Sequence, residues 1–167
     1  MALTGEYVPS SSQWVRDQVA EFEASDGQRA NTLPDHPEWP IVVITSVGHK
    51  SGKLRKNPVM RVEHDGAYAA IASKGGHPEH PEWFHNFVAH PEVDLQDGAE
   101  KHTYRARLVE GDERALWWER SVAVFPRYDE YQASTEREIP VFVLERGRAS
   151  GLADGGRASG TAEPAKP

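Results

Sequence analysis

Two Asp-Gly pairs, each between short stretches of β-type sequence, constrain the fold more than any other feature of the chain. Asp65-Gly66 separates one pair of stretches and Asp97-Gly98 separates another. Asp-Gly between two such stretches favours a tight turn that joins antiparallel strands. The sequence therefore predicts two β-hairpins, built from residues 55–64 and 67–72 and from residues 93–96 and 102–109.

Helical spacing appears before, between and after the predicted hairpins. Val15, Val19 and Phe22 recur at i, i+4 and i+7, which predicts a helix over about residues 11–25 that ends at Asp26-Gly27. Similar patterns predict helices from Pro81 to His90, from Gly111 to Val124 and over residues 127–133. Two more strands are expected at residues 41–45 and 139–144, with a Pro-rich connection at residues 33–40.

About six mainly antiparallel strands with helices between them indicate an α+β fold with a small antiparallel sheet or barrel. The regular strand–helix alternation of a doubly wound fold is missing, which argues against a Rossmann nucleotide site. We expect one domain at residues 1–146. Residues 147–167 are rich in Gly, Ala and Ser and are predicted to form a disordered tail.

Composition excludes several classes of protein. The chain of 167 residues has no cysteine and a net charge of -7, which argues against thiolate metal sites, cysteine nucleophiles and nucleic-acid binding. No signal peptide is predicted, and the longest apolar stretch is far shorter than the roughly 20 residues that span a bilayer. A cytoplasmic protein without an integral membrane segment is expected.

Basic residues are concentrated in one segment of this acidic chain. Residues 39–62 contain no Asp or Glu but include Lys50, Arg55 and Lys56. The segment is either a solvated basic loop or a site for phosphate or carboxylate groups. The sequence Ser73-Lys74-Gly75-Gly76 follows a predicted strand and is either a plain turn or a place where backbone amides approach a ligand.

Two further sets of side chains have a structural and a functional interpretation. Tyr128 and Tyr131 lie three apart on a predicted helix, where they either pack in the core or present phenols to a pocket. His77, His80, His85 and His90 lie within 14 residues, but their spacing does not match a known zinc motif. We interpret these histidines as parts of polar turns and predict no metal site.

Taken together, segments from residue 40 to residue 144 resemble the deazaflavin-dependent nitroreductase family. These split-barrel reductases, which include the F420H2-dependent quinone reductases, use coenzyme F420. The segments that carry the resemblance are ITSVGHKSG (44–52), RKNPV (55–59), ASKGG (72–76), PEWFHNF (81–87), AHPEV (89–93), FPRYDEYQ (125–132) and REIPV (137–141).

The resemblance implies a split β-barrel with the cofactor in a groove across it. Lys50, Arg55 and Lys56 would hold the phosphate and oligoglutamate carboxylates, and Trp83 would begin the helix that closes the groove. The ring and phosphate would be lined by Asn57, Pro58, Val59, Ala72, Ser73, Lys74, Gly75 and Gly76. Tyr128 and Tyr131 match substrate-pocket tyrosines, whereas Met60 and Phe125 stand where well-known relatives have tyrosine, which implies a less polar pocket.

The activity implied is hydride transfer from reduced F420 to a planar, electron-poor acceptor: a quinone, an activated enone or a nitroaromatic. Ser73, Tyr128 and Tyr131 are the candidate catalytic donors to the developing oxyanion. The alternatives are an FMN-dependent split-barrel oxidoreductase and a non-catalytic F420 carrier. A monomer or homodimer is expected. Peripheral contact with the inner face of the plasma membrane would use the N-terminal helix, but its acidic face favours packing onto the barrel.

Overall fold

β2 (His36–Val47) is the longest strand and organises the sheet in the computed structural model, which describes residues 2–146. Its β-branched centre, Ile41–Ile44, is buried on both faces, as such a run favours. β2 pairs with β3 (Leu54–Met60) along one edge and with β6 (Glu92–Asp97) along the other, while β1 (Thr32–Leu33) adds a short extension.

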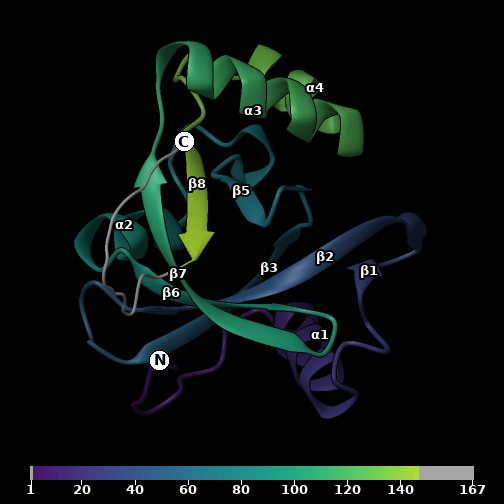
Figure 1. Cartoon of the computed structure of the whole chain (residues 1–167), viewed down its shortest axis with the longest axis vertical. Coiled ribbons are helices and arrows are strands. Elements are labelled where there is room, and N and C mark those ends of the chain that lie inside the picture. The colour runs from purple at the N-terminus through teal and green to yellow at the C-terminus, as the bar shows by residue number, and fades with distance from the viewer. Residues whose placement is uncertain (1, 147–167) are drawn as a thin grey trace.

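The sheet continues from β6 in the order β7, β8, β5 and β4. These strands are β7 (Glu100–Leu108), β8 (Val141–Arg146), β5 (Ala67–Ile71) and β4 (Glu63–His64). Every ladder between named strands is antiparallel, and β3 and β5 share no ladder. The sheet forms a half-barrel whose terminal strands, β3 and β4, do not pair with each other (Figure 1). The predicted α+β split-barrel fold is confirmed.

Alternation along the strands sends apolar side chains to two separate core clusters. Ile41 and Val43 join the first core cluster, whereas Val42 and Ile44 join the second core cluster. The first cluster also receives residues of α1 (Gln13–Ala24), α3 (Gly111–Val124) and α4 (Arg127–Ala133). The second cluster receives Phe87 from α2 (Glu82–Ala89).

Helices lie at opposite ends of the half-barrel, with α3 and α4 at one end and α1 at the other (Figure 1). Val19 and Phe22 of α1 are almost completely buried in the first core cluster. This burial confirms that the apolar stripe of the helix packs onto the barrel. No helix within residues 2–146 is long and apolar enough to cross a membrane.

The structure corrects three predictions about strands. Residues 36–40 belong to β2 and not to a Pro-rich connection, because the adjacent short strand β1 pairs with them. The expected strand over residues 55–64 is broken between β3 and β4, because its first half pairs with β2 instead of with β5. Residues 2–146 therefore form eight strands, and not about six.

Both predicted hairpins form, although each differs in detail from the expectation. Asp65 and Gly66 have φ angles of 52° and 83° and connect β4 to β5, as an Asp-Gly turn of this type requires. The second turn pairs Asp97 with Glu100, so its two loop residues are Gly98 and Ala99. Residues 147–167, the predicted tail, lie outside the described residues.

Candidate functional site

Two loops and helix α2 form the candidate site. The first loop, residues 48–53, connects β2 to β3. The second, residues 72–77, is the first part of the connection from β5 to α2 and contains the 3-10 turn η1 (Lys74–Gly76). Asn86 and Glu82 of α2 tie the first loop down: the His49 amide donates to Asn86 Oδ1 at 2.9 Å, and His49 Nε2 lies 2.9 Å from Glu82 Oε1. The hydrogen bond from His49 is the main reason that the pKa of the Glu82 carboxyl is lowered.

Asn86 lies inside a segment that resembles the family, but it is not among the predicted site residues. Its side chain is buried, 4% exposed, between Ser46 and the first loop. The sequence does contain a signal for this residue: a polar side chain stands at a helix position where the spacing predicts burial. A buried amide needs hydrogen-bond partners, so such a residue indicates a specific polar contact.

The second loop turns through three consecutive left-handed residues. Lys74, Gly75 and Gly76 have φ angles of 46°, 62° and 85°. A Cβ on Gly76 would lie 2.3 Å from Ser134 Oγ, so this glycine allows the loop to pack against α4. A Cβ on Gly75 would meet nothing within 4 Å, so this side of the loop is open.

Two amides of the second loop are available to a ligand. The Gly76 and His77 amides donate to the carbonyls of Ser73 and Lys74. The amides of Lys74 and Gly75 have no acceptor among residues 2–146. Open amides next to a lysine suit an anion.

Arg137, on the segment between α4 and β8, holds this loop from the side opposite to these amides. Its guanidinium donates to the carbonyls of His77 at 2.8 Å, Ser73 at 2.8 Å and Ala72 at 3.2 Å. Burial lowers the pKa of Arg137. Arg137 is not among the predicted site residues, because no local signal distinguishes an arginine that binds carbonyls from one that pairs with the glutamates beside it in sequence.

The cations of the basic segment, together with Lys74 of the second loop, divide into those that pair with a carboxylate and those that do not. Lys50, Arg55 and Lys74 form no ion pair with a carboxylate in the described part of the chain. Lys56 instead lies 2.5 Å from Glu23 Oε2 of α1 and 4.7 Å from the centre of the Tyr7 ring. β3 points Arg55 and Lys56 to opposite sides of the sheet. Lys56 therefore docks α1 and lies apart from the other predicted tail-binding cations.

The residues predicted to line the deazaflavin ring lie on β3, just after β5 and at the start of α2. Asn57, Pro58 and Val59 are half-buried on β3, and Val59 packs against the second core cluster. Ala72 and Ser73 are buried just beyond the end of β5. Trp83 is half-buried at the start of α2, where its ring lies 4.8 Å from Phe87 and 6.1 Å from Phe142. Val59 and Trp83 therefore pack against the same core cluster.

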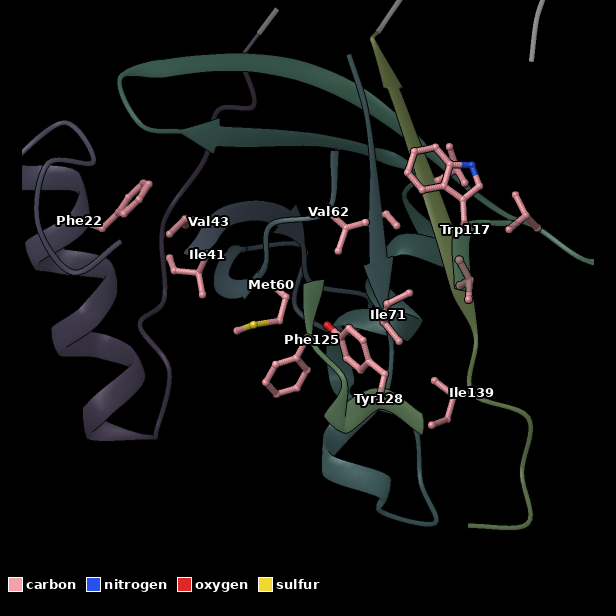
Figure 2. Packing of buried hydrophobic residues seen from close by; sticks show 14 of the residues in the cluster. Phe22, Ile41, Val43, Met60, Val62, Ile71, Trp117, Phe125, Tyr128 and Ile139 are labelled. Carbon is pink, nitrogen blue, oxygen red and sulfur yellow. The ribbon is translucent and has the colours of Figure 1, made fainter. Parts of the chain in front are cut away.

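The predicted pocket residues come together within the first core cluster. Figure 2 shows Tyr128 beside Phe125, Met60 and Ile71. The Tyr128 and Phe125 rings are 4.9 Å apart, and both side chains are 4% exposed. Burial, assisted by Tyr131, raises the pKa of Tyr128. The hydroxyls of Ser73, Tyr128 and Tyr131 have no hydrogen-bond partner among residues 2–146.

The histidines do not gather as a metal site. Within residues 2–146, no group of three or more His, Asp or Glu side chains is arranged to hold a metal ion. His85 of α2 lies 5.3 Å from His49 of the first loop and 6.2 Å from His80, which precedes α2, measured between ring centres.

A pocket of about 590 Å³ opens elsewhere, between α3 and the β4–β5 hairpin. Trp117, Leu116, His64 and Arg120 line part of it. None of the predicted site residues contributes to this pocket, so it is separate from the candidate site.

Comparison with known proteins identifies the family of the chain. The family model described as F420H(2)-dependent quinone reductase matches residues 14–146. An F420H(2)-dependent quinone reductase of Mycobacterium tuberculosis is 31% identical over 137 residues, covering 80% of this chain and 91% of the relative.

Two solved structures are also similar. An F420-H2 dependent reductase (FDR-A) is 51% identical with a TM-score of 0.61 and covers 64% of this chain and 94% of its own. A domain-swapped dimer is 44% identical with a TM-score of 0.64 and covers 81% of this chain and 100% of its own. The family model matches most of the chain, and the Mycobacterium tuberculosis relative is similar over most of both chains. The chain therefore belongs to the F420H(2)-dependent quinone reductase family.

Proposed function

We propose that this chain is an F420-dependent reductase that delivers a hydride to a quinone or to a similar planar, electron-poor acceptor. Family membership makes coenzyme F420 the cofactor. When bound, the reduced cofactor supplies the hydride, and the protein supplies binding, orientation and electrostatic stabilisation.

The observation that carries the proposal is the unbalanced positive charge around the two loops. Lys50, Arg55 and Lys74 form no salt bridge with a carboxylate in residues 2–146, although the whole chain has a net charge of -7 and Glu82 lies near enough to Lys50 for their charges to interact. The free amides of the second loop add two neutral donors next to Lys74. A ligand with a phosphate and several carboxylates would balance these charges, so the residues fit the acidic part of F420.

β3 and the segment just after β5 suit the planar ring. Asn57, Pro58 and Val59 on β3 and Ala72 and Ser73 after β5 would contact its two sides. We assign Gly76 a different role from the predicted one, because its missing side chain is needed against α4. Trp83 would limit the access of water from the α2 side.

Three hydroxyls are the candidates to donate to the acceptor. Burial raises the pKa of Tyr128, so its phenol stays protonated and is able to donate a hydrogen bond to a developing oxyanion. Ser73 and Tyr131 also carry hydroxyls without a partner in the described residues. Met60 and Phe125 beside Tyr128 make this region apolar, which favours quinones, and we keep activated enones and nitroaromatics as further acceptors to be tested.

Parallel titration with F420 and FMN tests the cofactor assignment. We expect oxidised F420 to bind with micromolar or tighter affinity, weakening with salt, and FMN to bind much more weakly, because FMN carries a single compact phosphate. Reduction of a soluble naphthoquinone by the protein with reduced F420 then distinguishes an enzyme from a carrier. Tighter binding of FMN, or tight F420 binding without turnover of any acceptor, would contradict the proposal.

Three remaining predictions belong to the same proposal. Residues 1–146 act as the reductase domain, so a chain that ends at residue 146 should keep F420 binding. The protein works in the cytoplasm, either free or in peripheral contact with the membrane, and co-sedimentation with vesicles distinguishes the two. A monomer or a homodimer is expected, and size-exclusion chromatography with light scattering distinguishes the two.

A further inference from the structure

Arg137 fixes the second loop from both of its ends. Its Nη1 and Nη2 atoms hold the carbonyls that enter the loop, at Ala72 and Ser73, and its Nε atom holds the carbonyl that leaves it, at His77. Three donors in one rigid plane therefore set the width and orientation of the loop.

The position of Arg137 is itself fixed by α4. Gln132 Nε2 donates to the Arg137 carbonyl at 2.8 Å, and Gln132 Oε1 accepts from the Ile139 amide at 2.9 Å. His80 Nδ1 lies 3.0 Å from Nη1 of Arg137. Because arginine only donates, His80 must accept in this contact. Arg137 thus transmits the position of α4 to the loop.

Peptide geometry links these contacts to the free amides. In a trans peptide, the C=O and the following N–H point in opposite directions. The Ser73 carbonyl points at the guanidinium, so the Lys74 amide points away from it. The Lys74 carbonyl accepts from the His77 amide inside the loop, so the Gly75 amide also points away from the loop interior. Gly75 is open on that side.

The charge of Arg137 is not cancelled by a carboxylate. It forms no ion pair within residues 2–146, and the neighbouring Glu138 lies 3.7 Å from Arg114 instead. Carbonyl oxygens stabilise the guanidinium but leave its full positive charge behind the loop. This charge and the ammonium of Lys74 both favour an anion next to the two amides.

We infer that Arg137 is a positioning residue that aims the Lys74 and Gly75 amides at an oxyanion of the phosphate type, without touching that anion itself. The inference rests on the proposed function, which makes the phosphate of F420 the natural occupant. Removal of Arg137 should therefore weaken only the part of binding that depends on the acidic half of the cofactor.

Fluorescence titration of two ligands tests this role: F420, and the deazaflavin nucleoside that lacks the phosphate and the tail. For Arg137→Met we expect roughly 10- to 100-fold weaker F420 binding and a change of less than about threefold for the nucleoside. Arg137→Lys, which keeps the charge but loses the planar fork, should still bind F420 about fivefold or more weakly. Arg107→Met, a half-buried arginine outside the site, should leave both affinities unchanged.

Equal losses for both ligands, full F420 binding in Arg137→Met, or wild-type binding in Arg137→Lys would each overturn the inference. A wild-type protein that binds neither ligand would overturn the proposed function instead. An NMR titration with inorganic phosphate gives a second, independent test of the inference. Phosphate-dependent shifts of the Lys74 and Gly75 amides that disappear in Arg137→Lys would support it, and their absence in the wild type would reject it.

Discussion

Arg137 and Arg107 are both half-buried arginines, but they lie in opposite electrostatic settings. Arg107 binds Glu113 and Glu145 through hydrogen bonds of 2.6–3.3 Å, and these bonds raise its pKa. Arg137 binds three carbonyls and no carboxylate, and burial lowers its pKa. Carboxylates therefore balance the charge of Arg107, whereas no carboxylate in residues 2–146 pairs with Arg137 and the proposed anionic ligand would balance its charge.

The same contrast runs through the basic segment. Lys53, Lys56 and Arg61 pair with Glu6, Glu23 and Asp97 and so hold the N-terminal region, α1 and the second hairpin in place. Lys50 and Arg55 have no such partner in the described residues. Cations that look alike in sequence therefore separate into a structural set and a set available to a ligand.

Substitution at the two loop glycines should give the largest effect. Gly76→Ala places a Cβ 2.3 Å from Ser134 Oγ and 3.1 Å from the Tyr131 carbonyl at a φ of 85°, so we expect a loss of about 2–4 kcal/mol in the free energy of unfolding. Gly75→Ala has the left-handed φ without the clash and should lose only about 1 kcal/mol. Chemical denaturation measures both, and equal losses would contradict the proposed close packing against α4.

Tyr128 and Tyr68 give the second test, because both are buried and only one is hydrogen-bonded. The Tyr68 hydroxyl donates to Asp97 Oδ2 at 2.5 Å, whereas the Tyr128 hydroxyl has no partner in residues 2–146. Tyr128→Phe should keep stability within about 0.5 kcal/mol and slow quinone reduction about 10- to 100-fold. Tyr68→Phe should lose about 1 kcal/mol of stability and keep its rate. The reverse pattern would remove Tyr128 from the catalytic set.

Removal of an unpaired lysine should affect binding and not stability. Lys74→Ala and Lys50→Ala should each weaken F420 binding about tenfold and reduce its dependence on salt, because each removes one charge from the anion site. The exposed Lys101 at the β6–β7 hairpin is the matched control, and Lys101→Ala should bind F420 normally. Isothermal titration at two salt concentrations measures the difference. Equal affinities in all three variants would show that the cations are ordinary surface charges.

The smallest effect concerns His80, which accepts from Arg137. Burial, with further contributions from Arg137 and His85, lowers the pKa of His80 below its ordinary value of 6.5. His80 is therefore protonated at a lower pH in the folded protein than in the unfolded chain. This contribution to stability is complete above about pH 6.5 and is lost as the pH falls through the lowered pKa of the folded state. His80→Gln keeps an acceptor and should flatten the stability profile between about pH 7 and 5, and an unchanged profile would contradict this assignment.

Local sequence signals predicted most of the helices and both hairpins. α4 forms over residues 127–133 as expected, and the Asp65-Gly66 turn has the two positive φ angles that such a pair favours. The pairing of β3 with β2 was missed, because strand partners depend on contacts between distant segments. The histidines similarly looked like separate turns, and only the fold brought His49 next to His85.

For the site, the sequence by itself determined the chemical inventory: a basic segment in an acidic chain, a Lys-Gly-Gly loop, a tyrosine pair and a family pattern. Only the tertiary structure decided which members of that inventory are available. It paired Lys56 with Glu23, directed Gly76 against α4, buried Tyr128 among apolar side chains and placed Arg137 behind the loop. The physical reason is that charge pairing, burial and hydrogen-bond satisfaction depend on neighbours in space, which the order of residues along one chain does not specify.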